Sequence, residues 1–232
     1  MSKALALTVA AVMMLFAGSI HAGDWHLLVN GKNLDGWKVL SGFARYEIVD
    51  GAIVGTAVKG SPNTYLCTTR NYADFELEFE VKCDPGLNSG VNIRSLVSDE
   101  EQAYWFWDRR KEAIGMWKIP PGRVHGYHAE IVSGKFGKFA LAGRVYDDGR
   151  RRYYIGEGLH TTDDFYKPGE WNTYRILCYG QSIKIWVNET LCTDLQDAMT
   201  SSGFIGLQVH GMSRNFRPLQ SRWRNIRLRE LE

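Results

Sequence analysis

Short runs of alternating apolar and polar residues, each ended by a turn signal, recur along this chain and constrain its fold more than any other feature. Asp50-Gly51 separates Arg45–Val49 from Ala52–Thr56, and an Asp-Gly pair between two such runs is a strong hairpin signal. Further strands are predicted at residues 64–69, 74–83, 90–95, 127–132, 171–179, 183–187, 204–210 and 223–230. One short helix is predicted at residues 99–110. Strands at short, turn-punctuated intervals predict an all-β sandwich or jelly roll of antiparallel sheets.

The first residues are typical of an export signal. Lys3 is followed by an apolar run over residues 4–20, which ends in small residues and Ala22. This order of a charged, an apolar and a small-residue region predicts a secretory signal peptide. The alternative is a membrane anchor, for which the run is short. We therefore expect residues 1–22 to be removed, leaving residues 23–232 as one domain that is secreted or periplasmic and not bound to a membrane.

The composition of the chain excludes several classes of protein. The 232 residues include 28 basic and 26 acidic side chains, so the formal net charge is only +2. Nucleic-acid-binding domains carry a concentrated basic excess, so no nucleic-acid partner is predicted. Hydrophobic residues make up 44% of the chain, which excludes a disordered or collagen-like protein.

Cysteines can form disulfides in an exported protein, and this chain has four: Cys67, Cys83, Cys178 and Cys192. A three-stranded meander predicted over residues 174–194 places Cys178 and Cys192 on strands that a third strand separates. Their separation would be roughly 9–10 Å, beyond the limit of about 7 Å for a disulfide. No Cys-x-x-Cys spacing indicates a metal site. We expect buried free thiols.

Three predicted strands, at residues 88–94, 127–131 and 205–211, divide into an apolar and a polar set because side chains alternate faces along a strand. The polar set consists of Asn92, Arg94, His128, Glu130, Gln208 and His210. An ordinary solvated sheet face is the alternative, but such faces are usually filled with Lys, Thr, Glu and Ser. Planar hydrogen-bonding groups beside glycines favour recognition of sugar hydroxyls.

Two other motifs bear on a sugar site. Glu76, Glu78 and Glu80 share one face of a predicted strand, as the clustered acids of jelly-roll glucanases do. Those enzymes need an acid of raised pKa and a nucleophile on either side of the bond, whereas such a row is more typical of a solvated face, so we assign it no catalytic role. Aromatic residues concentrate between two predicted strands, and Trp107 among them is a candidate platform for stacking on a pyranose ring.

Several segments, in their order along the chain, together resemble a known family. They are LVNGKNLDGW at 28–37, YADFEL at 72–77, NSGVNIRS at 88–95, GEWNTY at 169–174, GLQVHG at 206–211 and RNIRLREL at 224–231. On these segments the chain is similar to the bacterial 3-keto-disaccharide hydrolase family over nearly the whole of residues 23–232. Many relatives have Gly-Tyr-Gln-Ala-Asp-Ile where this chain has residues 126–131, so His128 and Glu130 are departures.

The resemblance implies a concanavalin A-like jelly roll, in which the concave side of two curved antiparallel sheets carries the site. It implies a carbohydrate-active hydrolase or lyase whose partner is an oxidised, 3-keto sugar or glycoside. The departures at His128 and Glu130 leave the sugar itself open. The aromatic stretch at residues 99–121 is longer than expected for the family and is a candidate determinant of specificity.

The chemistry that a 3-keto sugar needs can be assigned to candidate residues. A ketone at C3 acidifies the proton at C2, so a base can form an enolate that expels the C1 substituent, and water then adds. The reaction needs a base, an acid for the leaving oxygen and a group that stabilises the enolate. The candidates are Glu130 and His210 as base and acid in either order, Arg94 for the enolate, and Asn88, Asn92, His128, Tyr146, Asp147, Arg151, Gln208 and Trp107 for binding.

No cofactor is required by this scheme, although a divalent metal on Glu130 and His210 is an alternative way to polarise the ketone. Two other functions compete with it. An ordinary glycosidase would need a second essential carboxylate, from Asp147 or the Glu76 row. A non-catalytic carbohydrate-binding module would need aromatic and amide side chains but no titratable pair.

Overall fold

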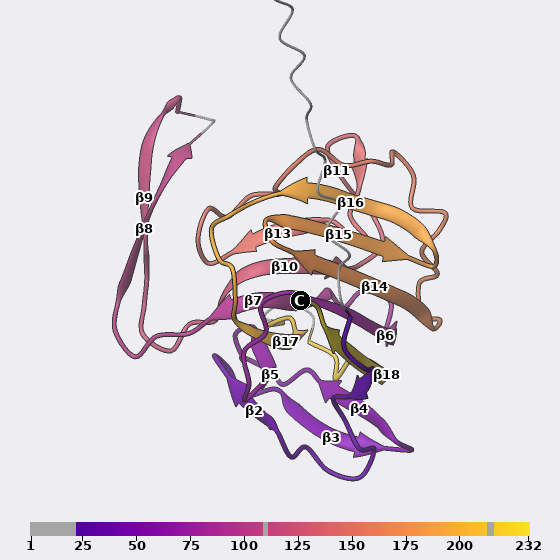
Figure 1. Ribbon diagram of the computed structural model, residues 1–232. Coiled ribbons are helices and arrows are strands. Elements are labelled where there is room, and N and C mark those ends of the chain that lie inside the picture. Colours follow the sequence, from indigo (N-terminus) through magenta and orange to yellow (C-terminus); the bar gives the residue numbers. More distant parts are fainter. Residues whose placement is uncertain (1–21, 109–110, 213–215) are drawn as a thin grey trace, which may run out of the picture.

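Two antiparallel sheets pack face to face in the computed structural model, which describes residues 22–108, 111–212 and 216–232 (Figure 1). All regular secondary structure assigned in these ranges is β-strand, so the predicted all-β sandwich is confirmed. Residues 1–21, which hold nearly all of the predicted signal peptide, lie outside the described residues. Within the described ranges, no helix has the length and apolar character to span a bilayer.

The larger sheet, called here the eight-stranded sheet, has the order β16-β15-β14-β6-β18-β4-β3, with β1 paired to β18. Its strands are β1 (His26–Leu27), β3 (Arg45–Val49), β4 (Ala52–Thr56), β6 (Phe75–Cys83), β14 (Asn172–Tyr179), β15 (Ser182–Val187), β16 (Thr190–Gln196) and β18 (Gln220–Glu230). The predicted hairpin of β3 and β4 is confirmed. Asp50 and Gly51 both adopt positive φ, at 50° and 78°, as a type I′ turn requires.

The smaller sheet, called here the six-stranded sheet, has the order β13-β10-β7-β17-β5-β2. Its strands are β2 (Trp37–Leu40), β5 (Thr64–Thr68), β7 (Ser89–Leu96), β10 (His125–Ile131), β13 (Val145–Asp148) and β17 (Phe204–Val209). Neighbours such as β7 and β17 are far apart in the sequence, so the sheet is assembled by long crossovers between the two layers, as in a jelly roll.

The hydrophobic core lies between the sheets and takes one side chain in two from each strand. Leu77 and Val81 of β6 are completely buried there, as are Val91 and Ile93 of β7. Burial of each such side chain contributes about 1.5–3 kcal/mol. This alternation turns the intervening polar residues of β7, β10 and β17 to the outside of the sandwich, where the candidate site lies.

The predicted meander is confirmed as β14, β15 and β16. Because β15 lies between the other two strands, Cys178 of β14 and Cys192 of β16 are not neighbours. All four cysteines are buried free thiols, and burial raises the pKa of the Cys178 thiol to about 12.

The helix predicted at residues 99–110 is wrong. β8 (Gln102–Asp108) and β9 (Ala113–Ile119) form a two-stranded hairpin instead, which projects from the body of the molecule (Figure 1). The aromatic residues follow period 2 rather than the helical period, with Tyr104 and Phe106 half-buried and Trp105 and Trp107 exposed. A second, short hairpin is formed by β11 (Lys135–Phe136) and β12 (Phe139–Ala140).

Candidate functional site

A polar cluster lies on the outer face of the six-stranded sheet and is nevertheless buried. One row of aligned residues crosses β10, β7, β17 and β5 and consists of Glu130, Gly90, Gln208 and Tyr65. In the next row, His128 of β10 is aligned with Asn92 of β7. These polar side chains are at most 5% exposed. Buried polar groups must find partners, and here they mostly find one another.

The carboxylate of Glu130 is held by neutral donors. Asn88 Nδ2 donates to its Oε2 (3.3 Å) and the Tyr154 hydroxyl donates to its Oε1 (3.1 Å). His128 Nε2 lies 3.9 Å from Oε2. In the described part of the chain, neither lysine nor arginine forms an ion pair with Glu130. A carboxylate of this kind is available to exchange a proton with a ligand.

The ring of His128 is oriented by Asn92. Asn92 Nδ2 donates to Ser95 Oγ (3.2 Å), so Asn92 Oδ1 is the atom that faces His128 Nδ1 (2.7 Å). An amide oxygen only accepts, so Nδ1 carries the proton and Nε2 faces Glu130. Gly90 makes room for the ring, because a Cβ there would lie 2.2 Å from His128 Nε2.

A hydrogen-bond chain fixes the amide of Gln208. The Tyr65 hydroxyl donates to Asp148 Oδ2, so its oxygen accepts from Gln208 Nε2 (3.2 Å). Arg123 forms an ion pair with Asp148 (3.1 Å). Gln208 Oε1 is thereby left buried, with no hydrogen-bond partner among the described residues. An orphaned acceptor of this kind is suited to a ligand hydroxyl.

A cavity of about 570 Å³ adjoins this cluster. Tyr146, Tyr154 and Arg144 line it, and they connect it to the cluster: Tyr146 is aligned with His128 across the β10–β13 pair, and Tyr154 holds Glu130. Burial, together with the charge of Glu130, raises the pKa of Tyr154. Its phenol therefore stays protonated and remains a hydrogen-bond donor.

Arg94 does not join the cluster, although alternation along β7 predicted that it would. Arg94 adopts a φ of 44°, and this left-handed residue breaks the alternation. Its guanidinium, 1% exposed, donates to Ala73 O, Gly180 O and Asp74 Oδ1, each at 2.7 Å. All three partners flank strands of the other sheet, so Arg94 ties the sheets together instead of facing the cluster.

Asp147 and Arg151 also lie away from the cluster. Asp147 is aligned with Tyr127, a core residue of β10, and is completely buried. It forms ion pairs with Arg150 (2.6 Å) and with Arg151, which also pairs with Asp197 (2.7 Å). The predicted substrate-binding residue Asp147 is thus occupied by a buried ion-pair network, while Arg151 reaches the edge of the cavity.

His210 and Trp107 are placed differently from expectation. His210 follows the end of β17, is exposed and contacts the carbonyl of its neighbour Gly211 through Nδ1 (2.8 Å). The histidine beside Glu130 is His128. Trp107 is 56% exposed on one face of the β8–β9 hairpin, whereas its neighbour Phe106 lines the cavity.

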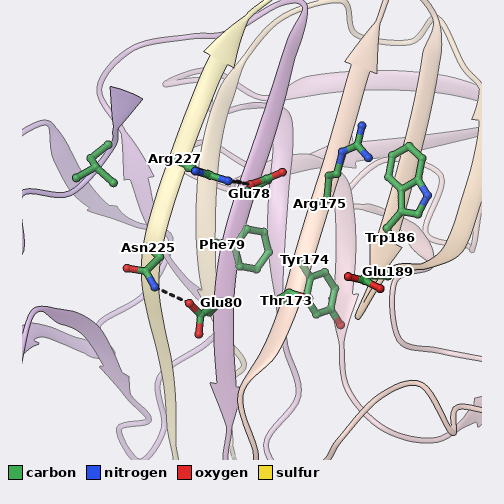
Figure 2. Close-up of a pocket in the computed structure, with 11 residues that line it drawn as sticks. Glu78, Phe79, Glu80, Thr173, Tyr174, Arg175, Trp186, Glu189, Asn225 and Arg227 are labelled. Atoms are coloured by element: carbon green, nitrogen blue, oxygen red, sulfur yellow. Dashed lines mark hydrogen bonds and ion pairs between the residues drawn. The ribbon is translucent and has the colours of Figure 1, made fainter. Parts of the chain in front are cut away.

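The outer face of the eight-stranded sheet holds a larger cavity of about 700 Å³, which Glu78 and Glu80 line (Figure 2). Arg227 Nε donates to Glu78 (2.9 Å) and Arg224 Nε donates to Glu80 (3.0 Å). Burial alone would raise the pKa of Glu80, but hydrogen bonds from Arg224 and Asn225 hold it below 4.5. A glycosidase acid needs a raised pKa, so despite its volume this cavity is a poorer catalytic candidate.

A metal on Glu130 and His210 stays a prediction. In the described ranges, no three His, Cys, Asp or Glu side chains gather into a group that could hold a metal ion.

Sequence reasoning missed Tyr65, Tyr154, Arg144 and Asp148. Tyr65 lies on a predicted strand and its outward direction follows from alternation along β5. Tyr154 and Arg144 lie outside regular strands, and no periodic signal marks them.

Comparisons with known proteins identify a family and agree with this fold. The sequence profile of the 3-keto-alpha-glucoside-1,2-lyase-like domain matches residues 24–229. No curated protein matches the chain significantly.

Solved structures resemble the chain in fold. A candidate glycosyl hydrolase from Parabacteroides distasonis ATCC 8503 is 18% identical, with a TM-score of 0.54 over 90% of this chain and 94% of that one. The carbohydrate-binding module CBM66 from Bacillus subtilis is 15% identical, with a TM-score of 0.53 over 83% and 94%. The kappa-carrageenase from Pseudoalteromonas carrageenovora is 10% identical, with a TM-score of 0.55 over 97% and 100%. The concanavalin A-like jelly roll is thus confirmed.

Proposed function

The chain belongs to the 3-keto-alpha-glucoside-1,2-lyase-like family, which is carbohydrate-active, and from this membership and the geometry of the site we propose that it cleaves 3-keto glycosides by elimination and hydration. The observation that carries the proposal is Glu130, a buried carboxylate held by neutral donors, with His128 Nε2 at 3.9 Å. This pair can supply the base and the acid that the reaction needs.

In the first step, Glu130 takes the proton from C2 of the 3-keto sugar, and the electron pair of that C–H bond forms an enolate with the C3 carbonyl. The enolate then expels the C1 oxygen, which breaks the glycosidic bond and leaves a double bond between C1 and C2. His128, protonated on Nε2, gives its proton to the leaving oxygen. The amide of Asn88 donates one of its two hydrogens to Glu130, and the second can donate a hydrogen bond to the developing negative charge.

In the second step, water adds to C1. His128, now neutral, takes a proton from that water, and Glu130, whose proton exchanges with solvent once the leaving alcohol has departed, protonates C2. Both residues end in their starting states and the product is the free 3-keto sugar. Asn92 acts as a positioning residue, because its hydrogen bond to Nδ1 keeps Nε2 directed toward Glu130.

Gln208 is proposed to hold the sugar. Its buried Oε1 has no partner in the described part of the chain, so a sugar hydroxyl would satisfy it. The Tyr65 hydroxyl accepts a hydrogen bond from Gln208 Nε2. This bond fixes the orientation of the amide, so Oε1 remains the atom that is available to a ligand. A Gln208→Ala variant should therefore raise KM more than it lowers kcat.

The proposal is tested by incubating the purified protein with a glucoside and with the same glucoside oxidised at C3. Breakdown of the keto sugar alone supports the proposal. Breakdown of both compounds would indicate an ordinary glycosidase, and binding of either without turnover would indicate a carbohydrate-binding module. Each of these two outcomes would overturn the proposed elimination.

We also propose that the protein acts outside the cytoplasm, in the periplasm or the medium. The charged, apolar and small-residue order of residues 1–22 supports this. N-terminal sequencing of protein from its native host should give Gly23 as the first residue. Recovery of a product that starts at Met1 in the membrane fraction would contradict it.

A further inference from the structure

The cavity beside Glu130 has an unusual lining for a site that takes neutral sugars. Its aromatic side chains are Phe106, Phe136, Phe139, Tyr146, Tyr153 and Tyr154. Its charged side chains are Asp108, Lys138, Arg144, Arg151 and Arg152. Cations therefore outnumber the single carboxylate on its walls. What the cavity can bind depends on which of these cations already form an ion pair within the protein.

Arg151 and Asp108 are accounted for within the protein. Arg151 forms ion pairs with Asp147 and Asp197. Asp108 pairs with Lys111 at 3.9 Å. The charges of both side chains are therefore paired within the protein, although Arg151 Nη2 is buried with no hydrogen-bond partner among the described residues.

Arg144 is different, because it is a buried cation that no carboxylate of the described residues contacts, although the charge of Glu130 acts on it. It is 6% exposed, and its guanidinium lies 4.5 Å from the ring centre of Tyr154 and 5.5 Å from that of Phe139. Its Nη2 donates to Gly156 O at 3.4 Å, and it forms no ion pair with any described residue. Burial lowers the pKa of Arg144 and outweighs the charge of Glu130, which acts in the opposite direction. A buried charge that forms no ion pair is costly, so Arg144 is suited to an anion that a ligand brings.

Arg152 is a second guanidinium without a carboxylate partner in the described part of the chain. It adopts a φ of 57° and lies 4.2 Å from the ring centre of Trp117 on β9. It therefore lies where the β8–β9 hairpin meets the body, and it lines the same cavity as Arg144. Arg152 also donates a hydrogen bond to the Tyr146 hydroxyl, and its remaining N–H donors are available to an anion.

We infer that this cavity receives the leaving group of the substrate, and that this group carries a carboxylate on a ring. The inference rests on the proposed function, since it assumes that Glu130 attacks the sugar at the mouth of the cavity. The aromatic walls would stack on the ring, and Arg144 and Arg152 would bind the carboxylate through paired N–H donors. The preference for an acidic leaving group would then be set by residues outside the catalytic pair.

Two matched substrates isolate the charge: the 3-keto glucosides of 4-hydroxybenzoate and of 4-hydroxybenzamide. They differ only in a carboxylate against a neutral amide of the same shape. We expect kcat/KM to favour the carboxylate by about 10- to 100-fold, the range that charged hydrogen bonds support. The preference should shrink at high ionic strength, because salt screens partly exposed charges.

Two variants locate the preference. Arg144→Gln and Arg152→Gln should each move the ratio of the two kcat/KM values toward one. Because Arg152 is exposed, the Arg152→Gln variant is expected to fold, and it tests the inference even if Arg144→Gln does not fold. The matched control is Arg45→Gln, an exposed arginine on β3 of the other sheet, which should retain the wild-type ratio.

The outcomes separate the two proposals. A wild-type ratio of one or less, or a ratio that survives in Arg152→Gln, would overturn the inference while the proposed function stands. If neither keto sugar is cleaved, the proposed function fails. Calorimetry with the unoxidised 4-carboxyphenyl and 4-carbamoylphenyl glucosides then decides the inference, which is overturned if the two bind equally or not at all.

Discussion

On the outer face of the eight-stranded sheet each glutamate of β6 meets an arginine of a neighbouring strand, whereas Glu130, on the outer face of the six-stranded sheet, meets a histidine, an amide and a phenol. Glu78 pairs with Arg227, and Glu80 pairs with Arg224. Tryptophans then cover the arginines, as Trp25 does for Arg227, at 4.7 Å from its ring centre.

The two faces arise from the same alternation of apolar and polar residues, so the pattern alone does not distinguish them. The difference lies in what each carboxylate faces across the sheet. An arginine stabilises the anion and occupies its oxygens, which builds a cross-strand ladder. Neutral donors fix the position of a carboxylate without an ion pair, which leaves it able to take up and return a proton. The first face therefore supports the sheet, and we propose that the second performs the chemistry.

The largest expected difference between the faces is in turnover. Glu130→Gln keeps the shape of the side chain but removes its ability to accept a proton, and loss of a general base lowers the rate by about 10²- to 10⁴-fold. Glu78→Gln, its counterpart on the other face, should retain near wild-type kcat on a 3-keto glucoside. The comparison fails if Glu78→Gln abolishes turnover while Glu130→Gln stays active.

A smaller effect is expected from closing the space beside His128. In Gly90→Ala, the new Cβ would lie 2.2 Å from His128 Nε2 and 2.6 Å from Ala129 O. The ring and the strand must shift, and overpacking of this kind costs about 1–3 kcal/mol. Urea denaturation should show this loss, and kcat should fall with it.

Gly206→Ala is the matched control, since Gly206 lies beside Asn92 on the neighbouring strand. Its Cβ would lie 3.2 Å from Cys67 Sγ and 3.5 Å from Asn92 Cβ. We expect a smaller loss of stability and little change in kcat. Equal effects of the two substitutions would show that the His128 ring does not need the space at Gly90.

The smallest expected effect concerns the ladder in acid. The pKa of Glu80 is held below its ordinary value of 4.5 in the folded protein. Its contribution to stability is therefore present above pH 4.5 and is lost as the pH falls through the lowered pKa. The melting temperature of Glu80→Gln should be slightly below that of the wild type at neutral pH, and the difference should vanish in acid. A difference that grows in acid would reverse the assigned sign.

Much of the fold could be predicted from the sequence because strands and turns carry local signals. Asp50-Gly51 sets one hairpin, and alternation along β7 and β17 identifies the core. The helix predicted at residues 99–110 conflicts with the high strand propensity of the aromatic residues 104–107, and their exposure in β8 follows period 2.

The site could be predicted only in part. Alternation predicts which face of the sheet a side chain lies on, but not its position along the strand relative to neighbouring strands. The sequence therefore predicts His210 as the partner of Glu130, whereas His128 holds that position. Alternation also fails where the backbone leaves the β region, as at Arg94 with its φ of 44°. Tyr154 and Arg144 reach the site through the folding of segments outside the main strands, and this depends on tertiary structure that no local pattern encodes.

The central claim is that Glu130 removes the proton at C2, and solvent isotope incorporation tests it most directly. A 3-keto glucoside is cleaved in D₂O, the released sugar is analysed at early times by NMR, and authentic product incubated without enzyme corrects for spontaneous exchange. The account predicts one deuterium at C2 for each glycosidic bond broken, with both cleavage and incorporation lost in Glu130→Gln. Cleavage that leaves protium at C2 and shows no primary isotope effect with substrate deuterated at C2 would show that the bond is broken by direct displacement at C1, and would contradict the account.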